Sequence, residues 1–465
     1  MDHSKYSRRK SSEVRIGGTP LGGDNPIRLQ SMTNTSTLDT QACIDQTKRI
    51  VDPGVVYVRL TTQGIREAEN LKFIKEGLRK DGYDVPLVAD VHFNAAVADV
   101  AALYADKVRI NPGNYVDPGR TFVHLEYTDE EYADELKKIE ERFVLFLNIC
   151  KEHHRAIRIG VNHGSLSDRI MSRYGDTPEG MVESCMEFLR ICVKEHFTDV
   201  VISIKASNTV VMVRTVRLLV AQMDKEGMSF PLHLGVTEAG EGEDGRIKSA
   251  VGIGALLCEG IGDTIRVSLS EAPEREIPVA RKLVDSIEEC ARLREEAKAS
   301  IENDTVTIEW HETDWETLQL KSAMALGALF IDGLAHQLVI KNDGFTEEKL
   351  TELSDAILQA ARVKFTKTEY ISCPGCGRTL YDLESTIARI KAATAHLSNL
   401  KIAIMGCIVN GPGEMADADY GYVGAGVGKV SLYRKKECVE KNIKAEDAVE
   451  HLLKLIEDDK KSQES

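Results

Sequence analysis

The sequence predicts an α/β protein with three parts: an N-terminal (β/α)8 barrel of the TIM type, a small α/β insert and a C-terminal α+β domain. The first observation is a repeat, because eight short apolar runs within about 290 residues each end in polar residues and precede a helical pattern. The second is that this repeat stops near residue 297, and the third is that cysteines at ligand spacing follow residue 367. We therefore place the three parts at residues 1–296, 297–367 and 368–465.

Eight runs have the continuous apolar character of strands that are buried on both faces of a parallel sheet. They are Ile27–Met32, Val55–Leu60, Leu87–Val91, Lys107–Ile110, Ala156–Val161, Val200–Ile204, Leu232–Val236 and Thr264–Leu269. Between them, stretches such as Thr177–Val193 and Ser270–Cys290 carry apolar residues at helical spacing. Eight alternating strands and helices predict a closed barrel. A doubly wound open sheet is the alternative, although no Gly-x-Gly-x-x-Gly follows the first strand.

Charged and polar side chains follow these strands, and in a barrel the strand ends gather on one face, where active sites lie. Five of these side chains are cations, namely Arg59, Arg109, Arg158, Lys205 and Arg266. Like charges repel at close range and lose hydration when they are buried, so this group predicts a bound anion. Because the fork of arginine fits phosphate oxygens, we expect a small diphosphate.

Two other strand-end residues have less definite roles. Asp90 fits a general base and equally fits a structural ion-pair partner of Arg59 or Arg109, and both interpretations stay open. His92 is expected to take a binding role at most, because loop histidines are more often held by hydrogen bonds than catalytic.

An acidic loop follows the seventh predicted strand, in the run Glu238-Ala-Gly-Glu-Gly-Glu-Asp-Gly245. Such a loop would also suit a Mg²⁺ ion. Because Glu238 lies at the strand end, we expect it to point into the pocket. We expect Glu241, Glu243 and Asp244 to face solvent.

The later part of the chain has shorter predicted elements. In the insert we expect two strands and two helices, at Thr305–Ile308, Glu316–Phe330, Leu338–Ile340 and Glu347–Ala361. In the C-terminal domain we expect elements at Leu383–Ala395, Lys401–Met405, Tyr420–Val423, Lys429–Tyr433 and Ala445–Glu457, followed by a disordered Asp458–Ser465. The basic turn Arg434–Lys436 would suit an acidic electron carrier, although a solvated turn is the plainer interpretation.

A cysteine motif lies in glycine-rich turns of the C-terminal domain. It consists of Cys373 and Cys376 in a Cys-x-x-Cys pair, then Cys407, then Glu414. Three thiolates can hold three irons of a [4Fe–4S] cube and leave the fourth iron for an oxygen ligand or a substrate. The surrounding glycines let the backbone approach a bulky cluster. A structural zinc site, closed by Glu414 or a histidine, is the alternative.

Composition excludes several classes of protein. The net charge of −15 argues against nucleic acid as a partner, and no apolar run is long enough to cross a membrane. The N-terminal segment lacks the apolar stretch of a secretory signal. Since the ten cysteines form no disulfide pattern, we expect a reducing, cytoplasmic compartment.

Together, the strand ends and the cysteine motif resemble the hydroxymethylbutenyl diphosphate synthase family, which acts in the methylerythritol phosphate route to isoprenoids. The resemblance extends from about Val14 to Glu457 and is weaker in the middle. It is carried by Gln30–Asn34, Ala89–Phe93, Arg109–Asn114, Arg158–Asn162, Lys205–Ser207, Thr264–Ser268, Ser372–Arg378 and Cys407–Glu414. It implies the reductive opening of 2-C-methyl-D-erythritol 2,4-cyclodiphosphate to 4-hydroxy-3-methylbut-2-enyl diphosphate, with loss of a water.

The resemblance also implies roles for single residues. Cys373, Cys376, Cys407 and Glu414 would ligate a [4Fe–4S] cluster. Two residues would be catalytic: Glu414 by yielding its iron to a substrate oxygen, and Glu238 by giving or relaying a proton. The substrate would be held by Arg59, Asp90, His92, Arg109, Asn111, Arg158, Asn162, Lys205, Ser207, Thr237, Arg266 and Ser268. The implied electron donor is a ferredoxin or a flavodoxin.

Members of the family that this chain resembles come in two lengths. In short members the cluster domain of one subunit caps the barrel of the other, which implies a homodimer. Long, plant-like members contain a second barrel-like domain, and Asn162–Asp168 and Leu234–Asp244 resemble that type. Because residues 297–367 are too few for a whole barrel, we expect a reduced insert, and whether the chain caps its own barrel stays open.

Two other functions fit the same residues. One is a non-redox barrel transferase or lyase that acts on a phosphorylated substrate and carries a structural zinc. The other is a non-catalytic iron–sulfur sensor. Metal content and turnover of the cyclodiphosphate would separate the three.

Overall fold

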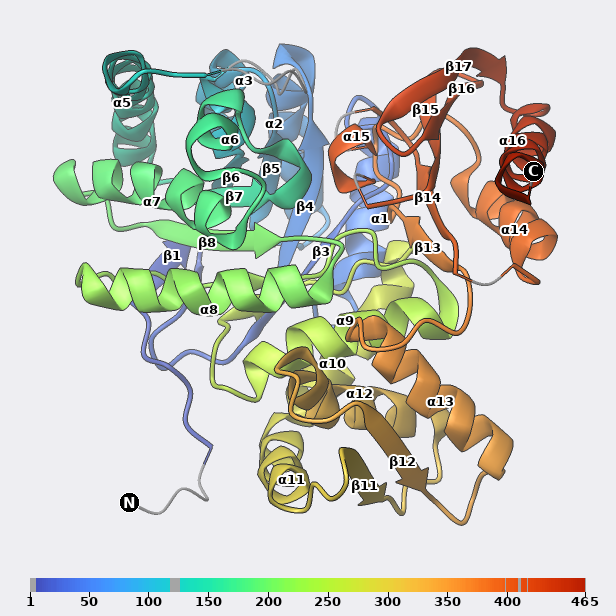
Figure 1. Cartoon of the computed structure of the whole chain (residues 1–465). Coiled ribbons are helices and arrows are strands. Elements are labelled where there is room, and N and C mark those ends of the chain that lie inside the picture. The colour runs from blue at the N-terminus through green and yellow to red at the C-terminus, as the bar shows by residue number, and fades with distance from the viewer. Residues whose placement is uncertain (1–5, 118–125, 398, 409–410, 416, 465) are drawn as a thin grey trace.

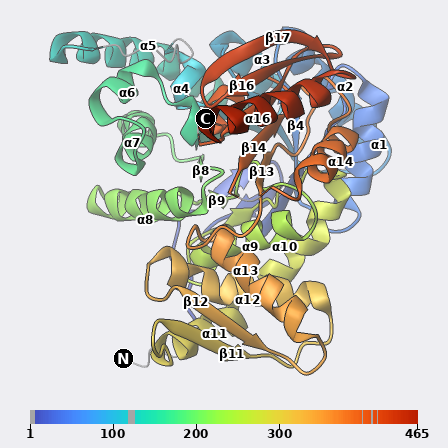
Figure 2. The same cartoon turned by 45° about the vertical axis from the view of Figure 1, so that its right-hand side comes forward.

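The computed structural model describes residues 6–117, 126–397, 399–408, 411–415 and 417–464. Figure 1 shows the barrel in blue to yellow-green, the insert below it in yellow to orange, and the C-terminal domain in orange to red beside it. A second view shows the insert and the C-terminal domain on adjoining sides of the same barrel (Figure 2). No helix in these ranges combines the length and the hydrophobicity that a membrane span requires.

The barrel consists of eight strands that all run parallel. They are β3 (Arg28–Met32), β4 (Tyr57–Thr62), β5 (Leu87–Val91), β6 (Lys107–Ile110), β7 (Ala156–Asn162), β8 (Val200–Lys205), β9 (His233–Leu234) and β10 (Thr264–Ile265). The strand order β8-β7-β6-β5-β4-β3-β10-β9 is completed by a parallel bridge between Ile202 and Leu232, which joins the two ends. The predicted barrel is therefore confirmed.

Strand residues alternate between the two faces of the barrel wall. On β6, Val108 and Ile110 lie in the main hydrophobic core, between the strands and the helices. The intervening Lys107 and Arg109 face the barrel interior, where Arg109 lines a cavity and Lys107 lies over a tyrosine ring. A strand that is apolar at every second position therefore carries cations to the interior.

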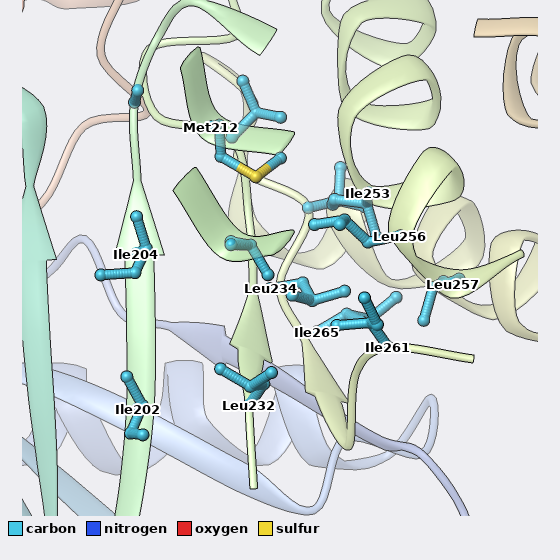
Figure 3. Close-up of a cluster of buried hydrophobic side chains, with 14 of the residues drawn as sticks. Ile202, Ile204, Met212, Leu232, Leu234, Ile253, Leu256, Leu257, Ile261 and Ile265 are labelled. Atoms are coloured by element: carbon cyan, nitrogen blue, oxygen red, sulfur yellow. The ribbon is translucent and has the colours of Figure 1, made fainter. Parts of the chain in front are cut away.

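The outer face of the barrel is a dry apolar layer. Figure 3 shows it at β8, β9 and β10, where Ile204, Leu234 and Ile265 lie near Ile253 and Leu256 of helix α9 (Gly242–Leu257). All five side chains are at most 1% exposed. This layer fixes the strands, so that their ends hold a rigid ring of side chains at the barrel mouth.

The remaining barrel helices follow the strands on the outside. They are α1 (Thr40–Val51), α2 (Ile65–Lys80), α3 (Ala95–Tyr104), α4 (Pro112–Tyr115), α5 (Asp129–His153), α6 (Asp168–Tyr174), α7 (Pro178–Lys194), α8 (Thr209–Lys225), α10 (Glu276–Asp285) and α11 (Ile287–Ala299). Asn94, Asn111 and Asn208 accept backbone hydrogen bonds at the starts of α3, α4 and α8. These caps make the turns from strand to helix tight.

The predicted helix Ser270–Cys290 is wrong in its extent. A 3-10 turn at Pro273–Arg275 precedes α10, and Ser286, with φ −96° and ψ 0°, separates α10 from α11. The predicted strands at both β9 and β10 are also too long, because regular strand structure covers only two residues of each. The residues after these strand cores instead approach the C-terminal domain.

A hairpin closes the end of the barrel opposite the mouth. Its strands β1 (Val14–Ile16) and β2 (Thr19–Leu21) are antiparallel, and their buried side chains pack on Tyr57, Val88 and Ala156, each the first or second residue of a barrel strand. The interior is therefore open only at the carboxyl ends of the strands.

The insert has the four predicted elements. They are β11 (Thr305–Glu309), α12 (Trp315–Ile331), β12 (Gln337–Lys341) and α13 (Glu347–Ala360), with β11 and β12 parallel. Helix α12 packs closely on α9, since a Cβ on Gly254 would lie 2.6 Å from Met324. The insert is therefore a layer on the barrel and not a free spacer.

The C-terminal domain has a mixed five-stranded sheet in the order β13-β14-β15-β16-β17. Its elements are β13 (Glu369–Ser372), α14 (Leu383–Thr394), β14 (Lys401–Met405), α15 (Gly411–Glu414), β15 (Tyr420–Gly426), β16 (Lys429–Arg434), β17 (Glu437–Lys444) and α16 (Ala448–Glu464). The predicted disorder of Asp458–Ser465 is wrong up to Glu464, because α16 continues and Asp459 pairs with Arg434 at 2.7 Å. Strand β17 has no counterpart among the predicted elements.

Candidate active site at the barrel mouth

One cavity lies where the C-terminal domain covers the open end of the barrel. The barrel contributes Met32, Arg59, Asp90, His92, Arg109, Arg158, Asn162, Ser203, Lys205, Thr237, Glu238, Arg266 and Ser268. The C-terminal domain contributes Cys373, Cys376, Arg378, Thr379 and Cys407, among others. The predicted cations and the predicted cysteines therefore share one cavity within one chain.

Two of the arginines that the barrel strands contribute to the cavity are held by carboxylates. Arg266 donates to Glu276 on α10 at 3.0 and 3.1 Å. Arg109 donates to Asp90 at 3.1 Å and to the carbonyl oxygen of Gly160 at 2.9 Å. These bonds fix the guanidinium planes before any ligand arrives.

Arg158 and Lys205 have no carboxylate within ion-pair distance in the described part of the chain. Arg158 is 1% exposed, and its Nε and Nη1 atoms have no hydrogen-bond partner. Burial, followed by the charge of Arg59, lowers the pKa of both side chains well below their ordinary values. An anion of two or more charges in this cavity would relieve that cost.

Asp90 lies between cations from both domains. It accepts from Arg109 at 3.1 Å and from Arg378 of the C-terminal domain at 3.3 Å. Burial alone would raise the pKa of Asp90, but Arg59 and Arg109 outweigh burial and hold it well below its ordinary value. This geometry favours the role of Asp90 as an ion-pair partner over the role of a general base.

The adjacent His92 contacts Arg109, and burial lowers the pKa of His92 to about 3, so the imidazole is neutral.

Two buried carboxyl groups interact at the edge of the cavity. Glu414 accepts a hydrogen bond from Thr237 Oγ1 at 3.1 Å, and its other oxygen, Oε1, is buried without a partner. Burial and the neighbouring Glu238 raise the pKa of Glu414 well above its ordinary value, and burial also raises the pKa of Glu238. Because two adjacent buried carboxylates cannot both ionise easily, their proximity favours a proton on the pair.

The three cysteines of the motif lie in a backbone cradle. The amide of Gly406 donates to Cys373 Sγ at 3.2 Å, and a Cβ on Gly406 would lie 3.4 Å from that sulfur. Burial raises the pKa of Cys373 to about 12, so its thiolate requires a cationic partner such as a metal. This chemistry suits an iron–sulfur group. The three thiols and the unpartnered Glu414 oxygen can serve as iron ligands, and the Gly406 amide can donate a hydrogen bond to sulfur. Within the described ranges, no three His, Cys, Asp or Glu side chains form a single-ion site. Residues 409 and 410 of the motif lie outside those ranges.

Sequence reasoning missed Arg378, a sixth cation of the cavity. The signal is present, because Arg378 follows the Cys-x-x-Cys pair after one glycine. Two predicted substrate residues lie just outside the cavity wall. Asn111 caps α4 and donates to Ser165 at 2.8 Å, and Ser207 donates to the carbonyl oxygen of Glu414 at 3.4 Å. Their substrate contacts stay predictions.

The sequence suggested that Glu241, Glu243 and Asp244 face solvent. Glu243 is exposed, but Glu241 and Asp244 are only partly exposed, and all three have partners. Glu241 pairs with Lys391 of α14 at 3.2 Å, and Asp244 pairs with Lys367 just before β13. Glu243 accepts a hydrogen bond at 2.9 Å from the indole of an insert tryptophan. The reason is tertiary, since the insert and the C-terminal domain both fold back against this side of the barrel.

The basic turn Arg434–Lys436 lies far from the cysteines. In the sheet register Tyr420 is opposite Arg434 and also beside Ile402, at the start of β14. Cys407 follows the other end of β14. The register therefore favours the solvated-turn interpretation.

Comparisons with known proteins point to one family. A family model described as the GcpE TIM-barrel domain matches residues 11–281, and another described as the GcpE protein C-terminal domain matches residues 369–458. A Phocaeicola vulgatus protein named 4-hydroxy-3-methylbut-2-en-1-yl diphosphate synthase (flavodoxin) is 55% identical over 605 aligned positions, which cover 98% of each chain. Proteins of the same name from Bacteroides thetaiotaomicron and Leptospira interrogans are 55% and 37% identical, with 100% and 97% of each chain covered.

The first of these alignments is longer than this chain. Because the chain has 465 residues, an alignment of 605 positions includes at least 140 that are gaps on its side. The two family matches leave residues 282–368 between them, which is the region of the insert. The chain therefore matches long relatives from end to end with fewer residues.

Proposed function

This chain belongs to the GcpE family of 4-hydroxy-3-methylbut-2-en-1-yl diphosphate synthases, and from that premise we propose that it reductively opens 2-C-methyl-D-erythritol 2,4-cyclodiphosphate. The product is 4-hydroxy-3-methylbut-2-enyl diphosphate. Two electrons and two protons enter, two carbon–oxygen bonds break, one carbon–carbon double bond forms, and one water leaves. The observation that carries the proposal is that six cations and three cysteines line one cavity.

The cations support the choice of a diphosphate substrate. Arg109 and Arg266 are already oriented by carboxylates, so they can donate to phosphate oxygens at little further entropic cost. Arg158 and Lys205 lack such partners, so the diphosphate would supply the charge that they need. The substrate ring would thus be anchored by its phosphates, with its carbon atoms toward the cysteines.

The carboxyl pair supports a role in proton delivery. A hydroxyl group leaves carbon readily only as water, so the reaction needs a proton donor near that oxygen. Glu238 lines the cavity, and burial raises its pKa, as suits a carboxyl group that acts as an acid. We assign Glu238 as the donor or relay, with Glu414 as its buried neighbour among the proposed cluster ligands.

Cys373, Cys376, Cys407 and Glu414 would hold the [4Fe–4S] cluster. When bound, that group supplies single electrons and a Lewis acid for a substrate oxygen. The protein's part is to hold the thiolates and to exclude water. Gly406 donates its amide to Cys373, and the ion pair between Arg378 and Asp90 closes one side of the cavity.

We take a flavodoxin as the electron donor, because the relatives named above carry that word in their names. A ferredoxin is the alternative. Reduction of the enzyme by each purified carrier under anaerobic conditions would decide between them.

Anaerobic purification followed by turnover tests the proposed function. About four irons and four sulfides per chain are expected, together with conversion of the cyclodiphosphate in the presence of dithionite and viologen. One zinc and no colour would instead indicate a non-redox barrel enzyme. A full cluster without turnover would indicate a sensor.

A further inference from the structure

A group of buried charges outside the cavity joins all three parts of the chain. Lys248 on α9 donates to Glu369, the first residue of β13, at 3.1 Å. Arg362, which follows α13 of the insert, pairs with the other oxygen of Glu369. The three side chains, which we call the clamp, are only 8%, 11% and 12% exposed for Lys248, Glu369 and Arg362.

Two more exposed ion pairs flank the clamp. In both of them the acid is on the barrel side of the contact and the lysine is on the side of the C-terminal domain. Glu241 pairs with Lys391, and Asp244 pairs with Lys367, so both acids come from the acidic run that begins at Glu238 and enters α9. The lysines belong to the C-terminal domain or to the segment that enters it. The clamp has the opposite polarity, with the cation Lys248 on the barrel and the acid Glu369 on the C-terminal domain, so charges of both signs are matched across the contact.

The clamp is connected through one short strand to Cys373 and to Glu238 of the cavity. Its Glu369 lies on β13, and the last residue of that strand, Ser372, precedes Cys373. Ser372 also forms a parallel bridge with Ala239, the residue after Glu238. The same short strand therefore connects the clamp to a cysteine on one side and to the cavity carboxyl on the other.

Stability alone does not account for three buried charges here. Replacing a buried ion pair by apolar residues of similar volume is often neutral or stabilising, because desolvation offsets much of the attraction. In some proteins a buried polar or ionic group instead selects one arrangement, since a displaced charge finds no substitute partner. The clamp therefore fits a role in placement.

We propose that the clamp is a positioning device, which seats the C-terminal domain on the barrel of the same chain. Its consequence for catalysis rests on the proposed function. Arg362 is then a positioning residue: it contacts neither substrate nor cysteine, and it acts through Glu369 and β13. The insert has a role in the reaction because it supplies Arg362.

Carbodiimide cross-linking tests the seating independently of activity. The reagent couples a lysine to a carboxylate only where the two touch, and the partly exposed pair of Lys391 and Glu241, at 3.2 Å, is accessible. The coupled peptides should come from the denatured band of a single chain, 51.5 kDa. Glu241→Gln should abolish them. Recovery only from a band of twice that mass, or from neither band, would overturn the proposal.

Steady-state kinetics of the holoenzyme test the positioning role. Arg362→Met should lower kcat about 10- to 100-fold, as expected for a displacement of about 1 Å, and leave KM within about threefold because the cations are untouched. Cluster absorbance should not change, and Arg362→Lys should restore most of kcat. Lys364→Met, which removes an exposed pair with Asp355 nearby, is the matched control.

The outcomes separate the two proposals. If kcat of Arg362→Met equals that of Lys364→Met, or if Arg362→Lys does not recover, the clamp does not position the site. If wild-type holoenzyme does not turn over the cyclodiphosphate, the proposed function fails, and the cross-linked band still decides how the domain is seated.

Discussion

Replacing Arg158 by methionine should make the ligand-free protein more stable and its substrate binding weaker. The side chain is 1% exposed, and two of its nitrogens have no hydrogen-bond partner. The charges that act on it most strongly are Arg59 and Arg109, which repel it, and Asp90 attracts it less strongly. A methionine would fill similar space without this desolvated charge.

The expected magnitudes follow from this environment. Removing a poorly compensated buried charge should stabilise the free protein by about 1–4 kcal/mol. In a domain of this size each kcal/mol raises Tm by about 2–4 °C. Loss of a buried charge-assisted contact to the diphosphate should cost about 2–5 kcal/mol of binding, which raises KM about 30-fold or more.

Arg169→Met is the matched control, because Arg169 is also buried, at 3% exposed, but forms ion pairs with two carboxylates. It donates to Glu187 at 2.7 and 2.8 Å and to Asp117 at 3.1 Å, and it lies outside the cavity wall. Its loss leaves two buried carboxylates and should destabilise by about 3–5 kcal/mol with KM unchanged. Thermal unfolding of both holoenzymes and steady-state kinetics measure the contrast. If Arg158→Met also unfolds at a lower temperature, or keeps the wild-type KM, the account of the cation group is refuted.

Three other predictions concern the rest of the site. Cys407→Ser should abolish cluster absorbance and turnover but leave the far-ultraviolet circular dichroism of the barrel unchanged, and normal turnover would remove Cys407 from the ligand set. The pKa of His92 is about 3 in the folded protein, against an ordinary value of 6.5. As the pH falls, the unfolded chain therefore binds this proton before the folded protein does, and stability is lost between about pH 6.5 and pH 3. His92→Gln should lose that part of the pH dependence in urea unfolding at pH 7 and pH 5, and an unchanged dependence would contradict the neutral histidine. Gly164→Ala should lower kcat about 100-fold with the cluster retained, because its Cβ would lie 2.2 Å from the backbone of Gly413 and displace the Glu414 turn, and wild-type kcat would show that the turn can shift freely.

The barrel was predictable because its signals are local. On β6 the order Lys107-Val108-Arg109-Ile110 alternates charge and hydrophobicity, and the same period places a cation in the interior of several other strands. Once eight such strands close, their inward residues must meet, so the cation group follows from topology. Arg378 fits the same logic from the C-terminal domain, but its place depends on how that domain docks.

Pairing between distant segments was not predictable. Arg266 and Glu276 are separated by ten residues, yet the pairing depends on the break of the predicted helix before α10. The acidic loop is a second case, since Glu241 is 150 residues from Lys391. In sequence these carboxylates look like a solvated turn, and only the folded-back insert and C-terminal domain give them partners.

The short insert provides the contacts that hold the C-terminal domain over the barrel mouth. Helix α12 is packed against α9, where a Cβ on Gly327 would lie 3.0 Å from Val251, and α9 also carries Lys248. Helix α13 ends just before Arg362, so a rigid path leads from the barrel through the insert to Glu369. Nothing along this path requires a second barrel. The at least 140 positions by which the Phocaeicola vulgatus alignment exceeds this chain can therefore be absent without loss of the clamp, provided that α12, α13 and Arg362 are kept.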